Sequence, residues 1–284
     1  MNISGYISPG KIDVHQHFWR YDPVQYDWIS DKMGVLRSDF LPRDFKKASH
    51  ESGYLESIAI QARQSIEETD WLLEMAGKNL SIRGVVGWLD LCASNIEEQV
   101  NEYASNPLLK GLRHVLQDEP DDSFMIRPEF LNGISCLEPS GLLYEILIFP
   151  RQLTKAIQLA SLFPSQRFVL DHCAKPRIGH GEIQEWAEMV TQLASFPNVS
   201  CKVSGLVTEA DWNLWQPDDF YPYLDVIWNA FGEDRIMIGS DWPVCLLAAS
   251  YSQVVGMAEG YFEKFGPEVL RKLTAANAIR IYQL

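Results

Sequence analysis

Lys11-Ile12-Asp13-Val14 is a short run with β-branched residues at alternate positions, a pattern typical of a β-strand, and it is the first of eight short runs of β-branched or apolar residues. The other seven are also short and rich in β-branched or apolar residues, at positions 57–61, 84–89, 111–115, 143–149, 167–171, 199–203 and 235–238. Such side chains favour strands because they pack well on a pleated, half-buried surface. The sequence therefore predicts eight strands.

Helical periodicity fills most of the intervals between these runs. Ser65 and Glu68 match the capping-box pattern, as do Ser94 and Glu97, and each pair begins a stretch whose apolar residues recur at helical spacing. Three further stretches end just before a proline or glycine that stops a helix, at 153–163, 183–196 and 222–231. Two more helical stretches follow the last strand, at 252–265 and 267–276. Strand and helix thus alternate along the chain.

This alternation favours parallel strands joined by crossover helices. At 284 residues the closed (β/α)8 barrel, or TIM barrel, is the natural arrangement, and we expect a single α/β domain over residues 1–284. A doubly wound sheet is the alternative, but it usually carries a glycine-rich first turn, and the sequence contains no GxGxxG or Walker A motif. Residues 19–42 form an extended loop rich in Trp, Tyr and Asp, and loops of this length are often functional.

The composition excludes several classes of partner. With 24 Lys and Arg against 38 Asp and Glu, the formal net charge is −14, which argues against binding to nucleic acid or to an anionic membrane surface. No uninterrupted apolar stretch is long enough to cross a membrane. Residues 1–11 lack the basic and apolar regions of a secretory signal. We expect a small-molecule partner, and the sequence does not specify the oligomeric state.

The cysteines indicate a reducing compartment. There are five, an odd number, and they are scattered without CxxC spacing, at Cys92, Cys136, Cys173, Cys201 and Cys245. A disulfide framework or a cysteine zinc site is not expected from this pattern. The sequence therefore predicts a cytoplasmic protein.

Histidines and a carboxylate follow the predicted strands at their C-terminal ends. His15 and His17 lie two residues apart on the first strand, so their side chains point to the same side. His114 ends the fourth strand, His172 ends the sixth, and Asp241 follows the eighth. These ends form one ring in a barrel, so the five side chains are expected to share a pocket. Taken singly, each histidine also has a structural interpretation, and the aspartate could cap the next helix.

Other catalytic centres have less support. There is no GxSxG motif around Ser240. Cys173 is adjacent to His172, and neighbouring residues of a strand face opposite sides of the sheet. Glu145 lies inside its strand and Glu209 lies beyond one, which gives little support to a two-carboxylate glycosidase. Imidazole and carboxylate side chains instead suit Zn²⁺ or a similar divalent ion.

Five motifs, in order, resemble the amidohydrolase-related proteins of the amidohydrolase superfamily. They are His-x-His-Phe-Trp at 15–19, Gly-Leu-Arg-His-x-Leu-Gln at 111–117, Leu-Asp-His-Cys-Ala-Lys-Pro at 170–176, Cys-Lys-x-Ser-Gly-Leu at 201–206 and Gly-Ser-Asp-Trp-Pro at 239–243. More narrowly, the chain is similar to the sugar-acid lactonase branch, which includes the L-fuconolactonase and L-rhamnonolactonase types. The resemblance extends over essentially the whole chain.

The resemblance implies a TIM barrel of the metal-dependent-hydrolase type and assigns site residues. His15 and His17 match the metal ligands of the first strand, and Asp241 matches a carboxylate that acts as both ligand and general base. His172 matches a histidine near the substrate and the water. The chain departs from the wider superfamily at the fifth strand, 143–149, which has no histidine. This departure implies at most one divalent ion, with Zn²⁺ the best candidate.

The reaction implied is the hydrolysis of an aldonolactone such as L-fuconolactone or L-rhamnonolactone. An ion would polarise the carbonyl or lower the pKa of bound water, and Asp241 would take the water's proton. His172 or His114 would stabilise the oxyanion or protonate the leaving oxygen.

Several further residues are candidates for binding the sugar. The basic ones, which could anchor hydroxyl or carboxylate groups, are Arg113, Lys175 and Lys202, and the aromatic ones, on which a sugar could stack, are Trp19 and Trp242. Two other functions remain open. One is a decarboxylase or other carbon–carbon lyase of the same superfamily, and the other is a sugar-binding barrel without catalysis.

Overall fold

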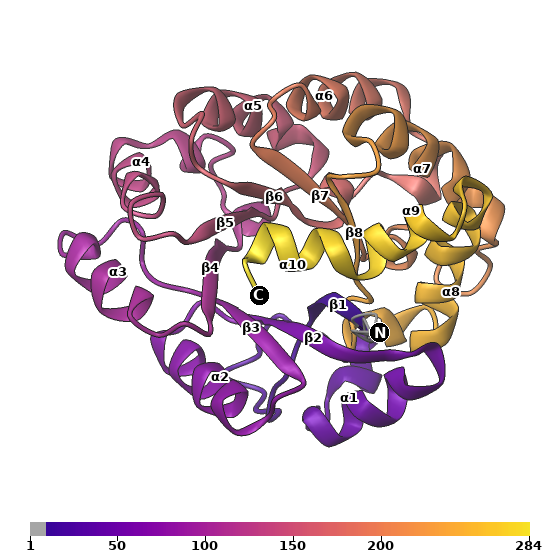
Figure 1. Cartoon of the computed structure of the whole chain (residues 1–284), viewed down its shortest axis with the longest axis horizontal. Helices are drawn as coiled ribbons and strands as arrows, with labels where there is room; N and C mark the ends of the chain where they lie inside the picture. Colours follow the sequence, from indigo (N-terminus) through magenta and orange to yellow (C-terminus); the bar gives the residue numbers. More distant parts are fainter. Residues whose placement is uncertain (1–9) are drawn as a thin grey trace, which may run out of the picture.

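The computed structural model describes residues 10–284. Eight parallel strands form one sheet in the order β1 to β8, and helices surround it (Figure 1). The strands are β1 (Lys11–Gln16), β2 (Tyr54–Ile60), β3 (Ile82–Gly87), β4 (Leu109–His114), β5 (Leu143–Ile146), β6 (Phe168–Leu170), β7 (Val199–Val203) and β8 (Ile236–Ile238). The predicted (β/α)8 barrel is confirmed. The predictions of a single domain over the whole chain and of no secretory signal include residues 1–9, which lie outside the described residues.

Backbone hydrogen bonds join the first and last strands just beyond the end of β8. The Asp241 N–H donates to the His15 carbonyl at 2.7 Å, and the His17 N–H donates to the Trp242 carbonyl at 2.7 Å. Gln16 and Trp242 form a parallel bridge between the same segments. The barrel therefore closes at the two motifs that carry the candidate ligands.

Ten α-helices are present among the described residues. They are α1 (Pro42–Ser49), α2 (Ile66–Lys78), α3 (Ile96–Ala104), α4 (Pro128–Ser135), α5 (Leu153–Leu162), α6 (Gln184–Ala194), α7 (Pro217–Phe231), α8 (Tyr251–Phe262), α9 (Pro267–Arg271) and α10 (Asn277–Tyr282). The helices α1 to α8 form the outer ring, and their apolar faces pack on the outside of the strands in one large core. Among residues 10–284, no helix combines the length and the apolar character that a membrane crossing requires.

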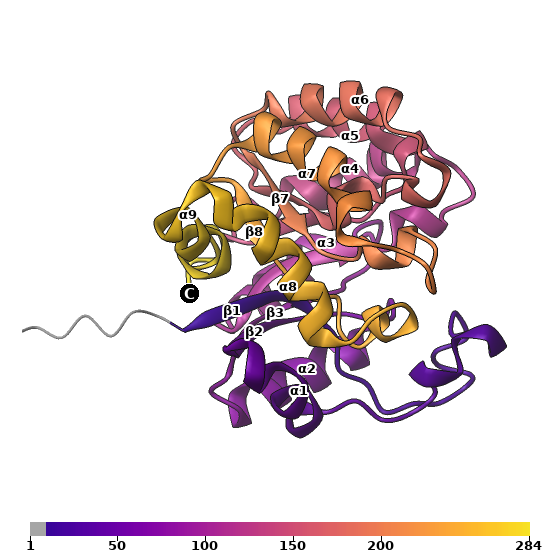
Figure 2. The same cartoon turned by 90° about the vertical axis from the view of Figure 1, so that its right-hand side faces the viewer.

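The helix α10 covers the end of the barrel at which the strands begin (Figures 1 and 2). Ile281 and Tyr282 pack on an interior cluster that includes Val14 and Met237. The Asn277 side chain donates to the Ile236 carbonyl at 2.7 Å. The opposite end, where the strands finish, is therefore the end that remains for a binding site.

Some helix boundaries differ from the sequence prediction. The helix α7 begins at Pro217 rather than Pro222, because Asp219 accepts a hydrogen bond from the Gln216 N–H and caps the earlier turn. At α2 only half of the predicted capping box forms: the Ser65 hydroxyl accepts from the Glu68 N–H, while the Glu68 carboxylate turns to other partners. At α3 no side chain caps the helix, so the second predicted box is wrong.

The extended loop 19–42 reaches out beyond β1, at the lower right of Figure 2. Its two ends are paired, because the Trp19 N–H donates to the Phe40 carbonyl at 3.0 Å and the Phe40 N–H donates back at 2.9 Å. A 3₁₀ helix, Asp31–Leu36, lies within it. Trp19 forms a small apolar cluster with Tyr26, Ile29 and Leu36. The loop therefore has its own core.

Candidate active site

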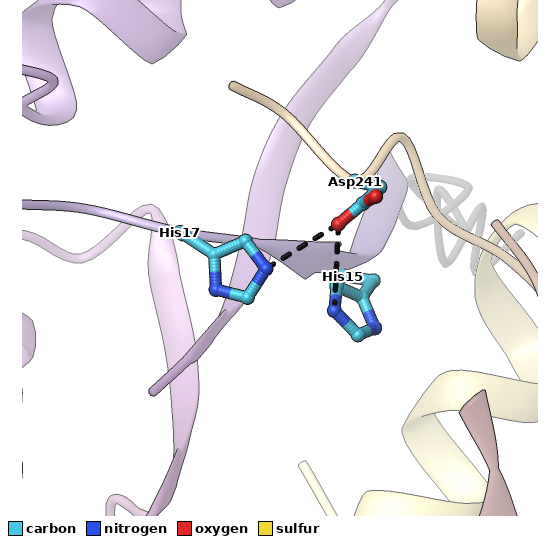
Figure 3. A group of neighbouring side chains, drawn as sticks. All are labelled: His15, His17 and Asp241. Atoms are coloured by element: carbon cyan, nitrogen blue, oxygen red, sulfur yellow. Dashed lines mark ion pairs between the residues drawn. The ribbon is translucent and has the colours of Figure 1, made fainter. Parts of the chain in front are cut away.

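His15, His17 and Asp241 meet at the end of the barrel where β1 and β8 finish (Figure 3). The Asp241 Oδ1 lies 3.7 Å from His15 Nε2 and 3.3 Å from His17 Nε2. All three side chains are buried. The spacing expected from the sequence is present: residues from opposite ends of the chain form one compact group.

Asp13, which the sequence analysis did not single out, holds this group together. Its carboxylate accepts hydrogen bonds from the Ser240 hydroxyl at 2.5 Å and from the Ser240 N–H at 3.0 Å. It also accepts from the His15 N–H at 3.0 Å and from the Tyr251 hydroxyl at 3.0 Å. The buried carboxylate therefore fastens the backbone beside Asp241 to the backbone of His15.

The approach of β8 to β1 requires a glycine. A Cβ on Gly239 would lie 2.7 Å from the His15 Cβ and 2.9 Å from its backbone nitrogen. Asp241 itself adopts a φ of 58°, a left-handed conformation that costs a non-glycine residue free energy and recurs at functional sites. The two features place the Asp241 carboxylate against the histidines of β1.

Further hydrogen bonds fix the two imidazole rings. His17 Nδ1 lies 2.9 Å from the Ile60 carbonyl, to which it donates, and Nε2 faces the Asp241 carboxylate. His15 Nδ1 lies 3.5 Å from Asp171 and 3.3 Å from Lys202 Nζ. Burial, and then the positive charge of Lys202, hold the pKa of His15 well below its usual range. His15 is therefore neutral near pH 7 and has a lone pair to offer.

A buried network of ion pairs lies below the histidines, inside the barrel. Lys202 pairs with Glu145 at 2.5 Å and with Asp171 at 3.1 Å, and Arg113 pairs with Asp171 at 3.1 Å. The Tyr282 hydroxyl of α10 donates to Glu145 at 2.6 Å. Lys202 is completely buried in this network. Lys202 is thus part of the barrel interior and does not line the cavity. The sequence analysis had suggested that Lys202 anchors the substrate.

The turn after β6 presents His172. Residues 172–175 all have φ values between 51° and 59°, a run of left-handed conformations that is unfavourable for side chains other than glycine. His172 Nδ1 lies 3.0 Å from the Ser204 hydroxyl. Gly205 makes room for the ring, since a Cβ there would lie 2.4 Å from His172 Nδ1. Burial and the nearby His15 hold the pKa of His172 well below its usual range, so the ring is neutral near pH 7.

Asp241 remains ionised in this environment. Burial alone raises the pKa of a carboxyl, but the positive charge that His172 can carry and the hydrogen bond from His17 oppose it. The net result is a pKa below the ordinary value of 3.8. Asp241 is therefore a carboxylate at neutral pH and can accept a proton.

A cavity of about 570 Å³ opens over these groups. It is lined by His17, His172 and Asp241 together with Arg113 and Lys175. The extended loop contributes four residues to its wall, Val24, Gln25, Asp27 and Trp28. The loop is thus positioned to contact whatever binds there.

Three other candidates from the sequence do not line this cavity. Trp19 is buried and donates from Nε1 to the Ser38 carbonyl at 2.9 Å. Trp242 packs edge to face against Phe40, Phe45 and Phe18. His114 is held by both ring nitrogens, at 3.3 Å from Trp88 Nε1 and 2.7 Å from the Glu119 carboxylate. Trp28 does line the cavity. It can therefore offer a sugar the flat surface that the sequence suggested for Trp19.

The residues present fit a divalent metal ion. Two imidazoles and one carboxylate have ligand atoms within 4.8 Å of one another, and three such ligands with an open position are typical of catalytic zinc sites. The hydrogen bond of His17 to a backbone carbonyl is the usual support for a metal-binding imidazole. Arg113 Nη1 lies 3.2 Å from His15 Nε2 and so competes with an ion for that lone pair.

The amidohydrolase family model matches residues 12–284, from β1 to the C-terminus. The chain belongs to the amidohydrolase family. The site at the ends of β1 and β8 is therefore the candidate active site of an amidohydrolase.

Relatives of this amidohydrolase include two lactonases and a solved zinc-bound structure. It is 40% identical to an L-fucono-1,5-lactonase from Burkholderia multivorans, with 96% of each chain covered. An L-fucono-1,5-lactonase from Burkholderia ambifaria is 32% identical, again with 96% of each chain covered. The crystal structure of an amidohydrolase from Burkholderia multivorans with bound zinc superposes with a TM-score of 0.92 at 40% identity, covering 96% of this chain and 99% of that one.

Proposed function

We propose that this protein is a hydrolase that opens the ring of a sugar-acid lactone, such as L-fuconolactone or L-rhamnonolactone. The observation that carries the proposal is the ionised Asp241 held 3.3 Å from His17 in a cavity large enough for a monosaccharide lactone. The similarity to the two L-fucono-1,5-lactonases supports the choice of substrate class.

Asp241 acts as the general base. A water molecule in the cavity gives a proton to the Asp241 carboxylate as its oxygen attacks the lactone carbonyl. The carboxyl then returns the proton to the ring oxygen as the bond between carbonyl carbon and ring oxygen breaks. The products are a hydroxy acid and the regenerated carboxylate.

His172 stabilises the negative charge that develops on the carbonyl oxygen. With the Ser204 hydroxyl donating to Nδ1, the neutral ring carries its proton on Nε2 and can donate it to the oxyanion. We assign this role to His172 rather than His114, because His172 lines the cavity and both nitrogens of His114 are engaged elsewhere.

We propose that His15, His17 and Asp241 would hold a single divalent ion, and that this ion is Zn²⁺. When bound, the ion supplies Lewis-acid polarisation of the carbonyl or acidifies a bound water. The strand β5 has the sequence Leu-Tyr-Glu-Ile and supplies no histidine ligand. The site therefore has ligands for one ion rather than two.

Lys175 is the basic group best placed to contact the substrate. It lines the cavity, and in the described part of the chain its ammonium group makes no hydrogen bond and one long ion pair, to Glu209. Arg113 also reaches the cavity, but its guanidinium is largely engaged by Asp171 and Gln61. We also propose that the protein acts in the cytoplasm without a nucleic-acid partner, consistent with five free cysteines and a net charge of −14.

A substrate panel tests the function. Purified protein is assayed with a pH indicator against aldonolactones, and for release of carbon dioxide against aromatic acids. Acid release from at least one aldonolactone, far above the rate with aromatic acids, is the expected result. Decarboxylation without lactone hydrolysis would favour the lyase, and binding of lactones without turnover, with or without added Zn²⁺, would favour the non-catalytic barrel.

A further inference from the structure

Lys175 stands between the catalytic cavity and a second, larger one. The second cavity has a volume of about 1300 Å³ and lies over the loops that follow β5, β6 and β7. Among the described residues, Lys175 is the one that lines both cavities. A ligand that extends from Asp241 toward the second cavity must therefore pass Lys175.

Glu209 faces Lys175 across this junction. It belongs to the segment after β7 and lines the second cavity. The Glu209 Oε1 lies 3.9 Å from Lys175 Nζ, too far for a hydrogen bond, and the two side chains retain 20% and 17% of their accessible surface. Neither charged group makes a hydrogen bond to any residue from 10 to 284. Both are half-buried and have unused bonding capacity.

The electrostatic environment connects Glu209 to the reaction centre. Burial raises the pKa of Glu209, Lys175 opposes the rise, and the negative charge of Asp241 adds to it. The Glu209 carboxylate is therefore close enough to be influenced by Asp241.

The arginine side chains of the second cavity already have partners. Arg177 pairs with Glu182 at 2.9 Å, and Arg151 pairs with Asp122 at 2.8 Å. The Lys175 ammonium also lies over the ring of Phe149, with Nζ 5.4 Å from the ring centroid. The junction thus combines a donor and an acceptor, each with free bonding capacity.

We propose that Lys175 and Glu209 together bind neighbouring hydroxyl groups of the sugar lactone, and that Glu209 is a specificity-determining residue. A hydroxyl group both donates and accepts a hydrogen bond, so a vicinal diol can accept from the ammonium and donate to the carboxylate. The lactone carbonyl lies at Asp241 and His172, and the hydroxylated part of the ring extends past Lys175. This inference rests on the proposed lactone hydrolysis.

The pair explains how the site distinguishes sugar lactones from simple ones. A substrate without the matching hydroxyl leaves a half-buried carboxylate desolvated and unpaired, which is costly. Discrimination by a polar group that must be satisfied is stronger than discrimination by an apolar wall.

The test combines enzyme variants with substrate analogues. Wild-type protein, Glu209→Gln and Glu188→Gln are assayed with an aldonolactone substrate and with its deoxy analogues, each lacking one hydroxyl. Glu188 is exposed on α6, lines neither cavity and controls for the loss of one negative charge. Glu209→Gln is expected to lower kcat/KM for the parent lactone by about tenfold or more, since a charged hydrogen bond is lost. For at least one deoxy analogue the loss is expected to be at least about fivefold smaller.

A purely structural role for Glu209 predicts a different pattern. In that case Glu209→Gln lowers kcat/KM by the same factor for the parent and for every deoxy analogue, which would overturn the proposal. If Glu209→Gln does not fold, as judged by its thermal transition, Glu209→Asp serves in its place because it keeps the charge and shortens the reach. If the wild type hydrolyses no lactone, the proposed function itself fails, and this outcome is distinct from equal losses across the analogues.

Discussion

The backbone N–H of Asp241 donates to the backbone carbonyl of His15 at 2.7 Å. The candidate base and the candidate ligand are thus joined by a main-chain hydrogen bond where the barrel closes. Their side-chain distance of 3.7 Å follows from this pairing of β1 with the end of β8. The site is therefore as rigid as the barrel itself, which is the condition for a preorganised catalytic group.

Asp13 is expected to be essential for this closure. In Asp13→Asn an amide NH₂ replaces one of two oxygens that together accept four hydrogen bonds, so two of these bonds must be lost or reversed. We predict a loss of about 1–3 kcal/mol in the free energy of unfolding and a lower kcat, measured by urea unfolding and by lactone hydrolysis. Wild-type values for both would show that Asp13 does not hold the closure together.

Gly205 is predicted to position His172. In Gly205→Ala the new Cβ would lie 2.4 Å from His172 Nδ1, so the ring must move, and we expect kcat to fall about 10- to 100-fold. Gly141→Ala is the matched control, because Gly141 also has a left-handed φ, 71°, but its Cβ would meet no atom within 4 Å. The two variants share the backbone penalty of about 1–2 kcal/mol. Equal kcat values in the two variants would contradict the role given to Gly205.

The buried Glu68 is expected to make stability depend on pH. It accepts hydrogen bonds from Tyr26 of the extended loop at 3.0 Å and from the backbone of Ala62 and Arg63. Burial raises the pKa of Glu68 to about 7, despite these hydrogen bonds. The unfolded chain, with a pKa near 4.5, binds fewer protons between pH 4.5 and 7, so stability falls as the pH rises through this window.

Glu68→Gln removes this titration. Relative to the variant, the wild type is expected to lose about 2–3 kcal/mol of unfolding free energy between pH 5 and pH 8, measured by urea unfolding at both values. Glu67→Gln changes the exposed neighbouring residue on α2. Relative to Glu67→Gln, the wild type is expected to lose no unfolding free energy between pH 5 and pH 8. A difference between wild type and Glu68→Gln that does not change with pH would contradict the prediction.

His17 is expected to be required for metal binding. His17→Ala removes one of three ligands, and we predict that the affinity for Zn²⁺ falls at least about 100-fold. Mutation of a residue that only hydrogen-bonds to a metal ligand already lowers metal affinity by about 10- to 100-fold. Equilibrium dialysis followed by elemental analysis measures the effect without any activity assay. His50→Ala, at an exposed histidine, controls for non-specific binding. Equal zinc content in the two variants would place the ion elsewhere.

The strands could be predicted from the sequence because each is a compact apolar run bounded by breaks in periodicity. All eight predicted runs overlap the observed strands. The helices α1 and α4 were not predicted, since each has only eight residues and a short apolar stripe. Short helices of this kind are stabilised by tertiary packing rather than by local signals.

The site was predictable only in part. The meeting of His15, His17 and Asp241 follows from the fold, because each lies at or just beyond the end of its strand. Asp13 was missed because its partner Ser240 lies 227 positions away in the sequence. Lys202 lies inside β7 rather than after it, and this position is the signal that could have identified it as a residue of the barrel interior.

Replacing Asp241 by Asn tests the central proposal most directly. The amide keeps the size of the side chain but cannot take a proton, and general-base catalysis typically contributes 10²- to 10⁴-fold to the rate. We predict that Asp241→Asn lowers kcat for lactone hydrolysis by about this factor while the protein stays folded, and that Asp218→Asn on the exposed start of α7 does not. Turnover by Asp241→Asn within about tenfold of the wild type, below the range expected for a general base, would contradict the account.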